Sequence, residues 1–323
     1  MTPVPPRPPE IAGHPVPPRL LESNDAGLVA WRERLPGVVD ELLEGWGLRA
    51  SAPFLPGGSS AWVAPVVTAD GAERVLKVAW AHDESRDEAA GMSAWQGHGA
   101  AGVHRAEREG ETAVLLLDRV RPGTPLAEWG TWPERDEVAA AVMRRLWVAP
   151  ERLVGAEEAA RFRPLAQMCS AWADGAAARA ASGPTGSTEP ERSDPSAGRL
   201  PDDLVEHALE RFRRLPEEWD GEQVLLATDL NPGNILASAG GPDPWVLIDP
   251  KPYVGDPHYD VLQHMLNDPE RMRAQPGHFA DRMAHLTGLD PRRVREWLLA
   301  RCVQESAWMD GAAEAALLLA RDL

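Results

Sequence analysis

A short loop between two apolar runs carries one aspartate and two asparagines. In the segment LLATDLNPGNIL, residues 225–236, Asp229 is followed five positions later by Asn234, and Asp249 ends the next apolar run, WVLID. Asp and Asn are common turn formers, so a tight turn is one explanation. The other is a site for Mg²⁺, a hard cation that prefers oxygen ligands. A hairpin between Asn234 and Asp249 would bring the three side chains to one end of a β unit, which favours chemistry.

Lys77 and Glu88 extend this set toward one reaction. Lys77 lies inside the apolar run VLKVAW, and Glu88 lies in the segment that follows it. Phosphoryl transfer from ATP relies on positioning and on stabilising dispersed negative charge. A lysine on a strand can hold the α- and β-phosphates, a glutamate on the next helix can fix that lysine, and Asp229 can take the proton of an acceptor hydroxyl. Each residue alone has an ordinary structural explanation, such as an edge-strand lysine or a solvated helix acid. Their order and spacing together predict a kinase.

The elements that would position these residues form an α+β pattern. The run AWVAPVVTADGAERVLKVAW, residues 61–80, predicts a hairpin, because Asp70-Gly71 is a strong signal for a two-residue turn. Strands dominate the first third of the chain and helices the rest. We therefore expect a small N-terminal β-sheet lobe, a larger mostly helical C-terminal lobe and a ligand cleft between them. The sequence further predicts a helix at 83–97, strands at 112–120, 224–229, 234–238 and 245–249, and helices at 135–147, 157–180, 201–215, 257–267, 277–287, 291–308 and 311–322.

Composition suggests how these elements divide along the chain. We expect a flexible Pro-rich arm at residues 1–24, a nucleotide-binding lobe at 25–118, and a catalytic and substrate-binding lobe at 119–323. A polar stretch rich in Pro, Gly and Ser at 181–198 is predicted to be a mobile loop between two helices.

The charge and the cysteines limit the partners and the compartment. The net charge of −17 argues against nucleic acid, because phosphate binding requires a basic face. It permits a cationic small molecule, although acidity that only maintains solubility is the alternative. Cys169 and Cys302 lie far apart with no Cys/His cluster, so neither a disulfide framework nor structural zinc is expected. Since the chain starts without an apolar signal region and lacks any long apolar run, we expect a cytoplasmic protein without membrane span or implied protein partner.

Longer segments resemble the aminoglycoside phosphotransferase family. The most specific lies within residues 225–267, from TDLNPGN to IDPKPYVGDPHYD, and LKVAW at 76–80, LLLDRVRPGTPL at 115–126 and REWLLARCVQESAW at 295–308 agree with it. The chain is most similar to the branch of streptomycin 6-phosphotransferase and hydroxyurea phosphotransferase, over roughly residues 25–310. The resemblance implies a bilobal protein-kinase-like fold and an ATP- and Mg²⁺-dependent transfer to a hydroxyl group of a small molecule.

The resemblance also implies roles for individual residues. Lys77, paired with Glu88, would hold the ATP phosphates. Asp118, Arg119 and Val120 would form a hinge beside adenine. Asp229 would be the catalytic base, and Asn234 and Asp249 would bind Mg²⁺. The sequence departs from the common pattern of the family at two places, which bear on the loop backbone and on the acceptor preference. Ala227-Thr228 stands where His-Gly is common, and Asn231 stands where a histidine is common.

The resemblance implies a streptomycin-like acceptor, and its charge points to the residues that would bind it. Streptomycin-like acceptors carry guanidinium or amine groups, which need carboxylates nearby because desolvating an unpaired charge is costly. Asp260 and Glu305 are candidate ligands, but Asp260 could instead brace the loop and Glu305 could be a solvated helix acid. We expect inactivation of a streptomycin-like antibiotic, and thus antibiotic resistance. A kinase of hydroxyurea or of another hydroxylated metabolite is one alternative, and a nucleotide-binding pseudokinase is another.

Other polar residues are given structural roles. Asp256 could cap the helix that begins near residue 257, or it could face substrate. His258 and His264 are six residues apart, a spacing that does not share a helix face, so we expect packing or surface positions. Cys302 is expected to be an inert buried thiol.

Overall fold

The structure, a computed structural model, describes residues 9–182, 200–240 and 244–323. The chain divides into two compact units: the first is Met1–Gly123 with Ser238–Gly241, and the second is Thr124–Ala237 with Pro242–Leu323. It passes from one unit to the other within β8 (Pro122–Pro125), a few residues after the expected boundary at 118/119. The loop predicted at 181–198 lies almost entirely outside the described residues.

The first unit contains a five-stranded antiparallel sheet of order β3-β4-β5-β7-β6. The hairpin predicted at 61–80 is confirmed, and Gly71 in its turn has a φ of +87°, which glycine adopts without steric strain. The last strand in this order, β6, was not predicted, because its charged sequence VHRAERE has no apolar alternation. The strand bounds are β3 (Arg49–Ala50), β4 (Ala61–Val67), β5 (Glu73–Trp80), β6 (Val103–Glu109) and β7 (Thr112–Asp118).

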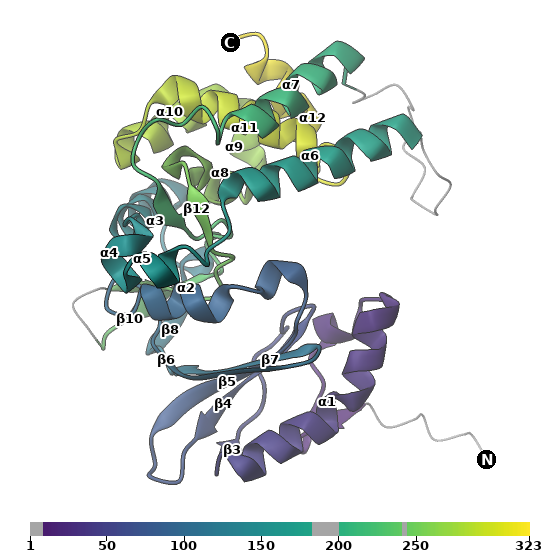
Figure 1. Cartoon of the computed structure of the whole chain (residues 1–323), viewed down its shortest axis with the longest axis vertical. Coiled ribbons are helices and arrows are strands. Elements are labelled where there is room, and N and C mark those ends of the chain that lie inside the picture. Colours follow the sequence, from purple (N-terminus) through teal and green to yellow (C-terminus); the bar gives the residue numbers. More distant parts are fainter. Residues whose placement is uncertain (1–8, 183–199, 241–243) are drawn as a thin grey trace. The chain divides into compact units, whose positions relative to one another are not determined.

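Helix α1 (Ala26–Gly45) covers one face of this sheet (Figure 1). Asp25 caps its start, where the side chain accepts a hydrogen bond from Leu28 N at 3.0 Å. No helix was predicted here, and Pro36 inside the helix weakens the sequence signal because proline lacks the N–H that a helix interior uses. The apolar stripe of the helix and the sheet form one core, which includes Trp31, Leu35, Val39, Trp62, Leu76 and Val78.

The segment expected to be a flexible arm contains secondary structure from residue 10 onward. This segment forms β1 (Glu10–Ile11), β2 (His14–Pro15) and the 3-10 helix η1 (Pro18–Leu21). Ile11 and Leu20 are buried in the core of the first unit. Burying such a side chain contributes roughly 1.5–3 kcal/mol to the stability of the fold, so these two residues hold the segment against the core although its composition is rich in proline.

Two short helical segments lie beyond β5 on the other side of the sheet from α1 (Figure 1). They are η2 (Asp83–Ser85) and α2 (Glu88–Ala94), in place of the single longer helix that was predicted. Side chains alternate between the two faces of a strand. Because Leu76 and Val78 belong to the core beneath α1, Lys77 points to the face that carries α2.

Helices dominate the second unit, as expected. Strand β10 (Ile235–Ser238) pairs with β11 (Trp245–Leu247), and β9 (Val224–Leu226) pairs with β12 (Tyr253–Gly255), which was not predicted. The helix predicted at 257–267 is divided in two, and α9 is additional. The helices are η3 (Leu126–Glu128), α3 (Trp132–Leu146), α4 (Pro150–Val154), α5 (Ala156–Ala159), α6 (Leu165–Ser182), α7 (Asp202–Arg214), η4 (Pro257–Tyr259), α8 (Val261–Leu266), α9 (Pro269–Ala274), α10 (Pro276–Thr287), α11 (Pro291–Glu305) and α12 (Ala312–Leu319).

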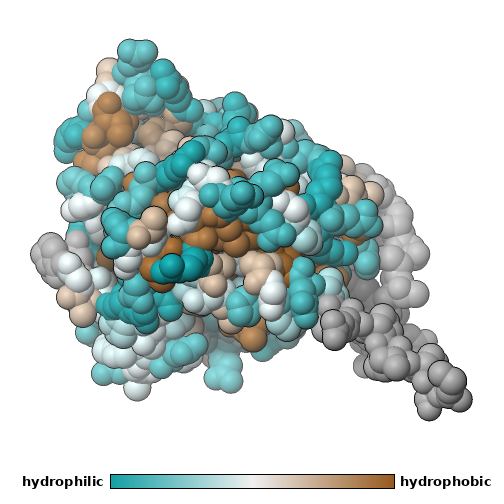
Figure 2. Space-filling view, turned by 90° about the horizontal axis from the view of Figure 1, so that it is seen from below, coloured by the Kyte–Doolittle hydropathy of each residue, from teal (hydrophilic) through white to brown (hydrophobic). Residues whose placement is uncertain are grey.

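Hydrophilic residues predominate on one face of the molecule. On the face shown in Figure 2, hydrophilic residues surround smaller apolar patches. Within the described part of the chain, no helix is both long enough and apolar enough to cross a bilayer. The large apolar side chains that are exposed among the described residues are Leu21, Phe54, Leu55, Trp129, Trp308 and Leu323.

Candidate active site

Lys77 and Glu88 form a buried ion pair in the first unit. Lys77 Nζ donates to Glu88 Oε1 at 2.7 Å, and the two side chains are 10% and 6% exposed. Strand β5 supplies the lysine, and the glutamate is the first residue of α2, where the helix dipole favours negative charge. The structure therefore brings together the two residues predicted to position the ATP phosphates.

The predicted hinge begins at a residue that is bonded to the neighbouring strand. Asp118 ends β7, where its Oδ2 accepts from Gly102 N at 3.1 Å and its Oδ1 lies 2.7 Å from His104 Nε2. Its backbone N also donates to Gly102 O at 2.9 Å. The Asp118 side chain therefore fastens the start of β6, while the roles of Asp118, Arg119 and Val120 beside adenine stay predictions.

In the second unit, Asp229 follows β9 in a tight turn. Asp229 N donates to Ala227 O at 2.7 Å, and Asn231 N donates to Asp229 O at 2.9 Å. The same Asp229 carbonyl accepts a bond of 3.0 Å from Asn234 Nδ2. This bond joins the two residues of the Asp-x-x-x-x-Asn spacing and leaves the amide oxygen of Asn234 as the atom suited to a cation.

The β10–β11 hairpin brings Asp249 to the same place. Ile248 N donates to Asn234 O at 2.8 Å, so Asp249 follows directly beside Asn234. Asp249 is exposed and has a φ of +54°, which Asp tolerates better than most residues. The hairpin thus groups Asp229, Asn234 and Asp249 at one end of this β unit.

The turn before Asp229 has a strained backbone. Thr228 has a φ of +47°, which for a β-branched residue is a genuine outlier. Glycine, which is common here in the family that the sequence resembles, adopts this conformation freely. Two contacts hold Thr228 in place: its Oγ1 donates to Lys251 O, and its N donates to Asp260 Oδ1 at 2.7 Å. Strain of this kind persists only where the surroundings fix it, and it is concentrated at functional sites.

Asp260 supports this turn from beneath. The side chain is completely buried, and its Oδ2 accepts from Ala227 N at 3.1 Å and from Trp147 Nε1 at 3.0 Å. Burial raises the pKa of Asp260, and the bonds from Trp147, Ala227 and Thr228 act in the opposite direction. The geometry favours the bracing alternative over substrate contact, because both carboxylate oxygens are engaged away from solvent.

A lysine side chain lies beside the Asp229 carboxylate. Lys251 Nζ is 3.6 Å from Asp229 Oδ2, and Asn231 Nδ2 donates to Oδ1 at 3.2 Å. Burial raises the pKa of Asp229; Lys251 and Asn231 act against this rise, and the negative charge of Asp249 adds to it. Lys251 was not among the predicted site residues, although the sequence shows it as a lysine two residues after Asp249 in IDPKP.

Glu305 is engaged inside the second unit. Its Oε1 pairs with Arg301 and its Oε2 accepts from Trp308 Nε1. The side chains of Arg301 and Glu305 are only 7% and 13% exposed. A cationic acceptor would have to displace Arg301 and take away its carboxylate partner, which is costly for a buried charge. The contact of Glu305 with an acceptor stays a prediction that this pairing does not favour.

The oxygen donors at the end of the hairpin suit Mg²⁺ without enclosing it. In the described ranges, no cluster of three or more His, Cys, Asp or Glu side chains could hold a metal on its own. Mg²⁺ is usually bound by one or two carboxylates together with substrate phosphates, not by an all-protein cage. The carboxylate of Asp249 and the amide oxygen of Asn234 match this donor set, so the residues fit a magnesium ion that binds with a nucleotide.

The remaining polar residues have structural positions. Asp256 caps η4, accepting from His258 N at 3.0 Å, and is completely buried, which favours the capping alternative over contact with substrate. The rings of His258 and His264 bond to Asp256 and Asp136 at 2.6 and 2.8 Å. Cys302 is buried as expected, and burial raises the pKa of its thiol to about 12.

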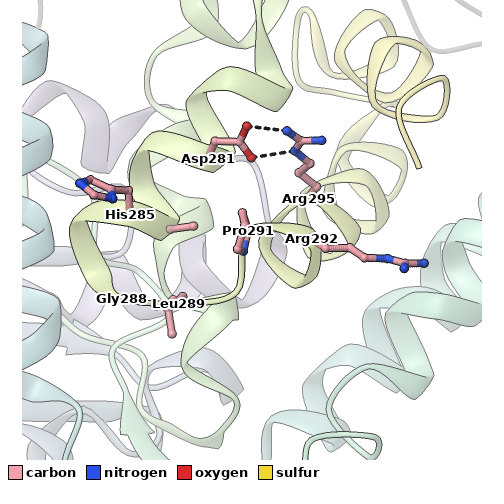
Figure 3. Close-up of a pocket in the computed structure, with 8 residues that line it drawn as sticks. Asp281, His285, Gly288, Leu289, Pro291, Arg292 and Arg295 are labelled. Carbon is pink, nitrogen blue, oxygen red and sulfur yellow. Dashed lines mark hydrogen bonds and ion pairs between the residues drawn. The ribbon is translucent and has the colours of Figure 1, made fainter.

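A surface pocket of about 580 Å³ lies elsewhere in the second unit, between α10 and α11 (Figure 3). Arg295 Nε donates to Asp281 at 2.8 Å inside it, and His285 and Arg292 also line it. None of its lining residues belongs to the Asp229 turn or to the β10–β11 hairpin. This pocket is therefore separate from the candidate site.

Comparison with known proteins decides the family. The family model for aminoglycoside/hydroxyurea antibiotic resistance kinases matches residues 46–312, most of the chain. The chain belongs to this family. It is thus an enzyme of the phosphotransferase class, and the family expected from the sequence is confirmed.

Two relatives and one solved structure define the similarity. The chain is 35% identical to a hydroxyurea phosphotransferase of Kitasatospora aureofaciens over 88% of this chain and 76% of that protein. It is 29% identical to a streptomycin 6-kinase of Streptomyces glaucescens over 91% of each chain. An ethanolamine kinase structure from Plasmodium vivax has a TM-score of 0.55 at 13% identity, covering 94% of this chain and 91% of that one. This last likeness concerns the fold alone, and it confirms the expected kinase-like fold.

Proposed function

We propose that this protein transfers the γ-phosphoryl group of ATP to a hydroxyl group of a small-molecule antibiotic, with hydroxyurea as the first candidate acceptor. The observation that carries this proposal is the grouping of Asp229, Asn234 and Asp249 at one end of the β unit, in a chain of this family. The grouping supplies a carboxylate for a hydroxyl beside oxygen ligands for the cation that accompanies a nucleotide.

Each residue of the site has a distinct part in the proposed reaction. Asp229 orients the acceptor hydroxyl and takes its proton as the bond from that oxygen to the γ-phosphorus forms, the bond from this phosphorus to the bridging oxygen breaks and ADP leaves. Mg²⁺, when bound by Asn234 and Asp249, would neutralise charge on the nucleotide phosphates. Lys77 would contact the α- and β-phosphates, in an orientation fixed by Glu88. The Thr228 turn and its buried support would keep Asp229 in one position, since a shift of about 1 Å can lower a rate by about 100-fold.

Hydroxyurea is favoured over a streptomycin-like cation by two observations. The hydroxyurea phosphotransferase relative is 35% identical to the chain, and the streptomycin 6-kinase relatives are 29% and 27% identical. In addition, both carboxylates expected to receive a cationic acceptor are already engaged: Asp260 is buried and Glu305 is paired with Arg301. Hydroxyurea is uncharged and places no demand on a carboxylate of this kind.

Streptomycin is the second candidate, supported by the 91% mutual coverage with the streptomycin 6-kinase relative. A hydroxylated metabolite is a further alternative. A pseudokinase is disfavoured because Lys77, Asp229, Asn234 and Asp249 are all present.

The test is ATP consumption by the purified protein with Mg²⁺, measured with hydroxyurea, with streptomycin, with a panel of other hydroxylated compounds and without acceptor. The product is identified as a phosphorylated acceptor by mass spectrometry. We expect acceptor-dependent turnover that is fastest with hydroxyurea. Turnover with streptomycin alone would reverse the order of the two candidates, and nucleotide binding without turnover on any acceptor would favour the pseudokinase.

A further inference from the structure

Lysine is almost absent from this chain. Only two of its 33 Lys and Arg residues are lysines, Lys77 and Lys251. The ion pairs at the surface use arginine instead, as in Arg34–Glu111, Arg152–Glu222 and Arg161–Glu158. Arginine carries a broad planar fork, whereas lysine carries a compact point charge on a flexible stem. A chain that uses arginine elsewhere therefore has its two lysines beside Glu88 and beside Asp229, two carboxylates predicted to take part in phosphoryl transfer.

The backbone of Lys251 is fastened to the strained turn. Lys251 N donates to Ala227 O at 2.8 Å, and Lys251 O accepts the bond from Thr228 Oγ1. Two residues later, Tyr253 pairs with Leu226 as β12 joins β9. The bonds to Ala227 and Thr228 thus fix the position of this lysine beside the turn that carries Asp229. On the lysine, these bonds are made by backbone atoms.

The two oxygens of Asp229 have different neighbours. Asn231 holds Oδ1 at 3.2 Å, and Lys251 Nζ lies 3.6 Å from Oδ2. The Lys251 and Asp229 side chains are 34% and 21% exposed, so a solute can reach this side of the carboxylate. An acceptor hydroxyl that donates to Oδ2 would therefore lie within a few ångströms of the ammonium group, beside the phosphorus that it attacks.

We propose that Lys251 is a catalytic residue whose ammonium group contacts the phosphoryl group during its transfer to the acceptor held by Asp229. This inference rests on the proposed function, because it requires ATP and an acceptor at this site. An ammonium carries three N–H donors, so it can contact Asp229 and a phosphoryl oxygen at once. Positive charge placed where negative charge develops stabilises the transition state more than the bound substrates.

The competing explanation is a structural ion pair between Lys251 and Asp229. A pair at 3.6 Å with partly exposed side chains would contribute little to stability. On that explanation, removing the ammonium changes stability slightly and leaves the rate of the folded enzyme unchanged, because the loop is held by backbone atoms. The two explanations therefore differ in kcat.

The kinetic test compares Lys251→Met and Lys251→Arg with Arg161→Met, which removes a 65% exposed arginine from a surface pair. We expect Lys251→Met to lower kcat by about 100-fold, the scale for losing one transition-state contact, with KM for ATP and acceptor changed less than about threefold. Lys251→Arg keeps the charge with a different shape and should lose roughly 10-fold. Melting temperatures and the Arg161→Met rate should match the unmodified protein. A folded Lys251→Met protein with kcat within about threefold of the unmodified protein would overturn the proposal.

A labelling test uses the fact that the chain has only two lysines. An ATP derivative that carries an acyl group on its γ-phosphate acylates a lysine close to that phosphate. The lysine amine attacks the acyl carbonyl, an amide bond forms, the bond to the phosphate oxygen breaks, ATP leaves and the proton passes to the buffer. Peptide mass spectrometry then assigns the acyl group to Lys77, to Lys251 or to both.

The outcomes separate the inference from the proposed function. We expect Lys251 to be acylated by the ATP probe, with protection by excess ATP and Mg²⁺, whereas an acyl phosphate without the nucleotide should give much less labelling. Acylation of Lys77 alone would overturn the role of Lys251 and leave the ATP-dependent function intact. Acylation of neither lysine would contradict nucleotide binding itself, and with it both proposals.

Discussion

Two regions of the second unit contain fully or partly buried carboxylates with opposite surroundings. In the Asp136 cluster, the carboxylate is completely buried and accepts bonds from Arg271 at 2.7 and 2.8 Å, from Arg282 at 2.8 Å, and from His264 at 2.8 Å. In the turn of residues 227–234, Asp229 has one amide and one more distant lysine. Among the described residues, the groups that donate to the buried support of that turn, Asp260, are the neutral N–H groups of Trp147, Ala227 and Thr228.

The pKa shifts follow from this difference. Burial alone would raise the pKa of Asp136, but the bonds from Arg271, His264 and Arg282 hold it far below its ordinary value. Burial dominates for Asp229 and Asp260, whose pKa values are raised. A carboxylate paired with cations in this way is held in its charged form, and its removal would leave those cations unpaired, which suits a structural role. A carboxylate left partly uncompensated makes the fold less stable, and such residues are concentrated at functional sites.

The sharpest test of this comparison is Asp229→Asn, for which we expect the largest effect. The change keeps the shape and removes the proton acceptor, so kcat should fall by roughly 1,000-fold or more. The raised pKa means that the fold disfavours the charged form, so loss of the charge should not lower the melting temperature at pH 7. Phosphate transfer and thermal unfolding are measured on the same sample, with ATP binding as the control. If the variant loses much stability but keeps its kcat per folded molecule, Asp229 has a structural role like that of Asp136.

The Lys77–Glu88 pair is an exception to this comparison. The Glu88 carboxylate is buried and paired with a cation, as Asp136 is, and yet the pair is predicted to contact the nucleotide. We expect Lys77→Ala to lower kcat/KM for ATP by roughly 100-fold, and Glu88→Ala by roughly 10-fold because Glu88 acts through the lysine. Glu88→Ala should also lower the free energy of unfolding by about 3 kcal/mol, since it removes one partner of a buried pair. Glu107→Ala, which removes a surface pair with Arg105, is the matched control. Equal kinetics for all three variants would contradict a nucleotide contact.

Asp136→Asn should show the reverse pattern, with stability lost and activity kept. Removing the carboxylate takes away the shared partner of two guanidinium groups, so the free energy of unfolding should fall by roughly 3 kcal/mol at pH 7. Because the folded pKa of Asp136 is lowered, its contribution is fully present above the unfolded pKa of about 3.9 and is lost as pH falls. The difference between Asp136→Asn and the unmodified protein should therefore shrink below about pH 4. Urea unfolding at several pH values measures this, and a difference independent of pH would contradict it.

The sequence predicted the parts of the site that depend on local spacing. The Asp70-Gly71 turn indicated that Lys77 lies on a strand, and the hairpin after Asn234 indicated that Asp249 lies beside Asn234. The role of Asp260 was left open because it depends on bonds to Ala227 and Thr228, more than 30 residues earlier in the chain. No local signal marks such a contact. The positive φ of Thr228 also has no signal in a β-branched residue.

The errors in the fold have similar physical causes. Ile11 and Leu20 were assigned to a flexible arm because prolines surround them, yet burial decides their position. Helix α1 was missed although its buried residues recur at helical spacing, and Pro36 interrupts the pattern. Strand β6 is almost entirely exposed, so only its pairing with β7 identifies it. Local patterns thus located the chemistry better than the framework that supports it.

Glu305 gives the smallest expected effect and the finest test of the comparison. Its pairing with the buried Arg301 resembles the compensated surroundings of Asp136, which indicates a structural role, whereas the charge of a streptomycin-like acceptor would require an available carboxylate. On the structural interpretation, Glu305→Gln lowers the free energy of unfolding by roughly 1–3 kcal/mol, because Arg301 loses an ionised partner. KM should then stay within about twofold for hydroxyurea and for streptomycin. On the acceptor interpretation, KM for streptomycin rises with kcat unchanged, the pattern of lost uniform binding, while KM for hydroxyurea does not change. A rise confined to streptomycin would therefore restore the cationic acceptor as the leading candidate, and it would show that a well-paired carboxylate can exchange its partner for a substrate.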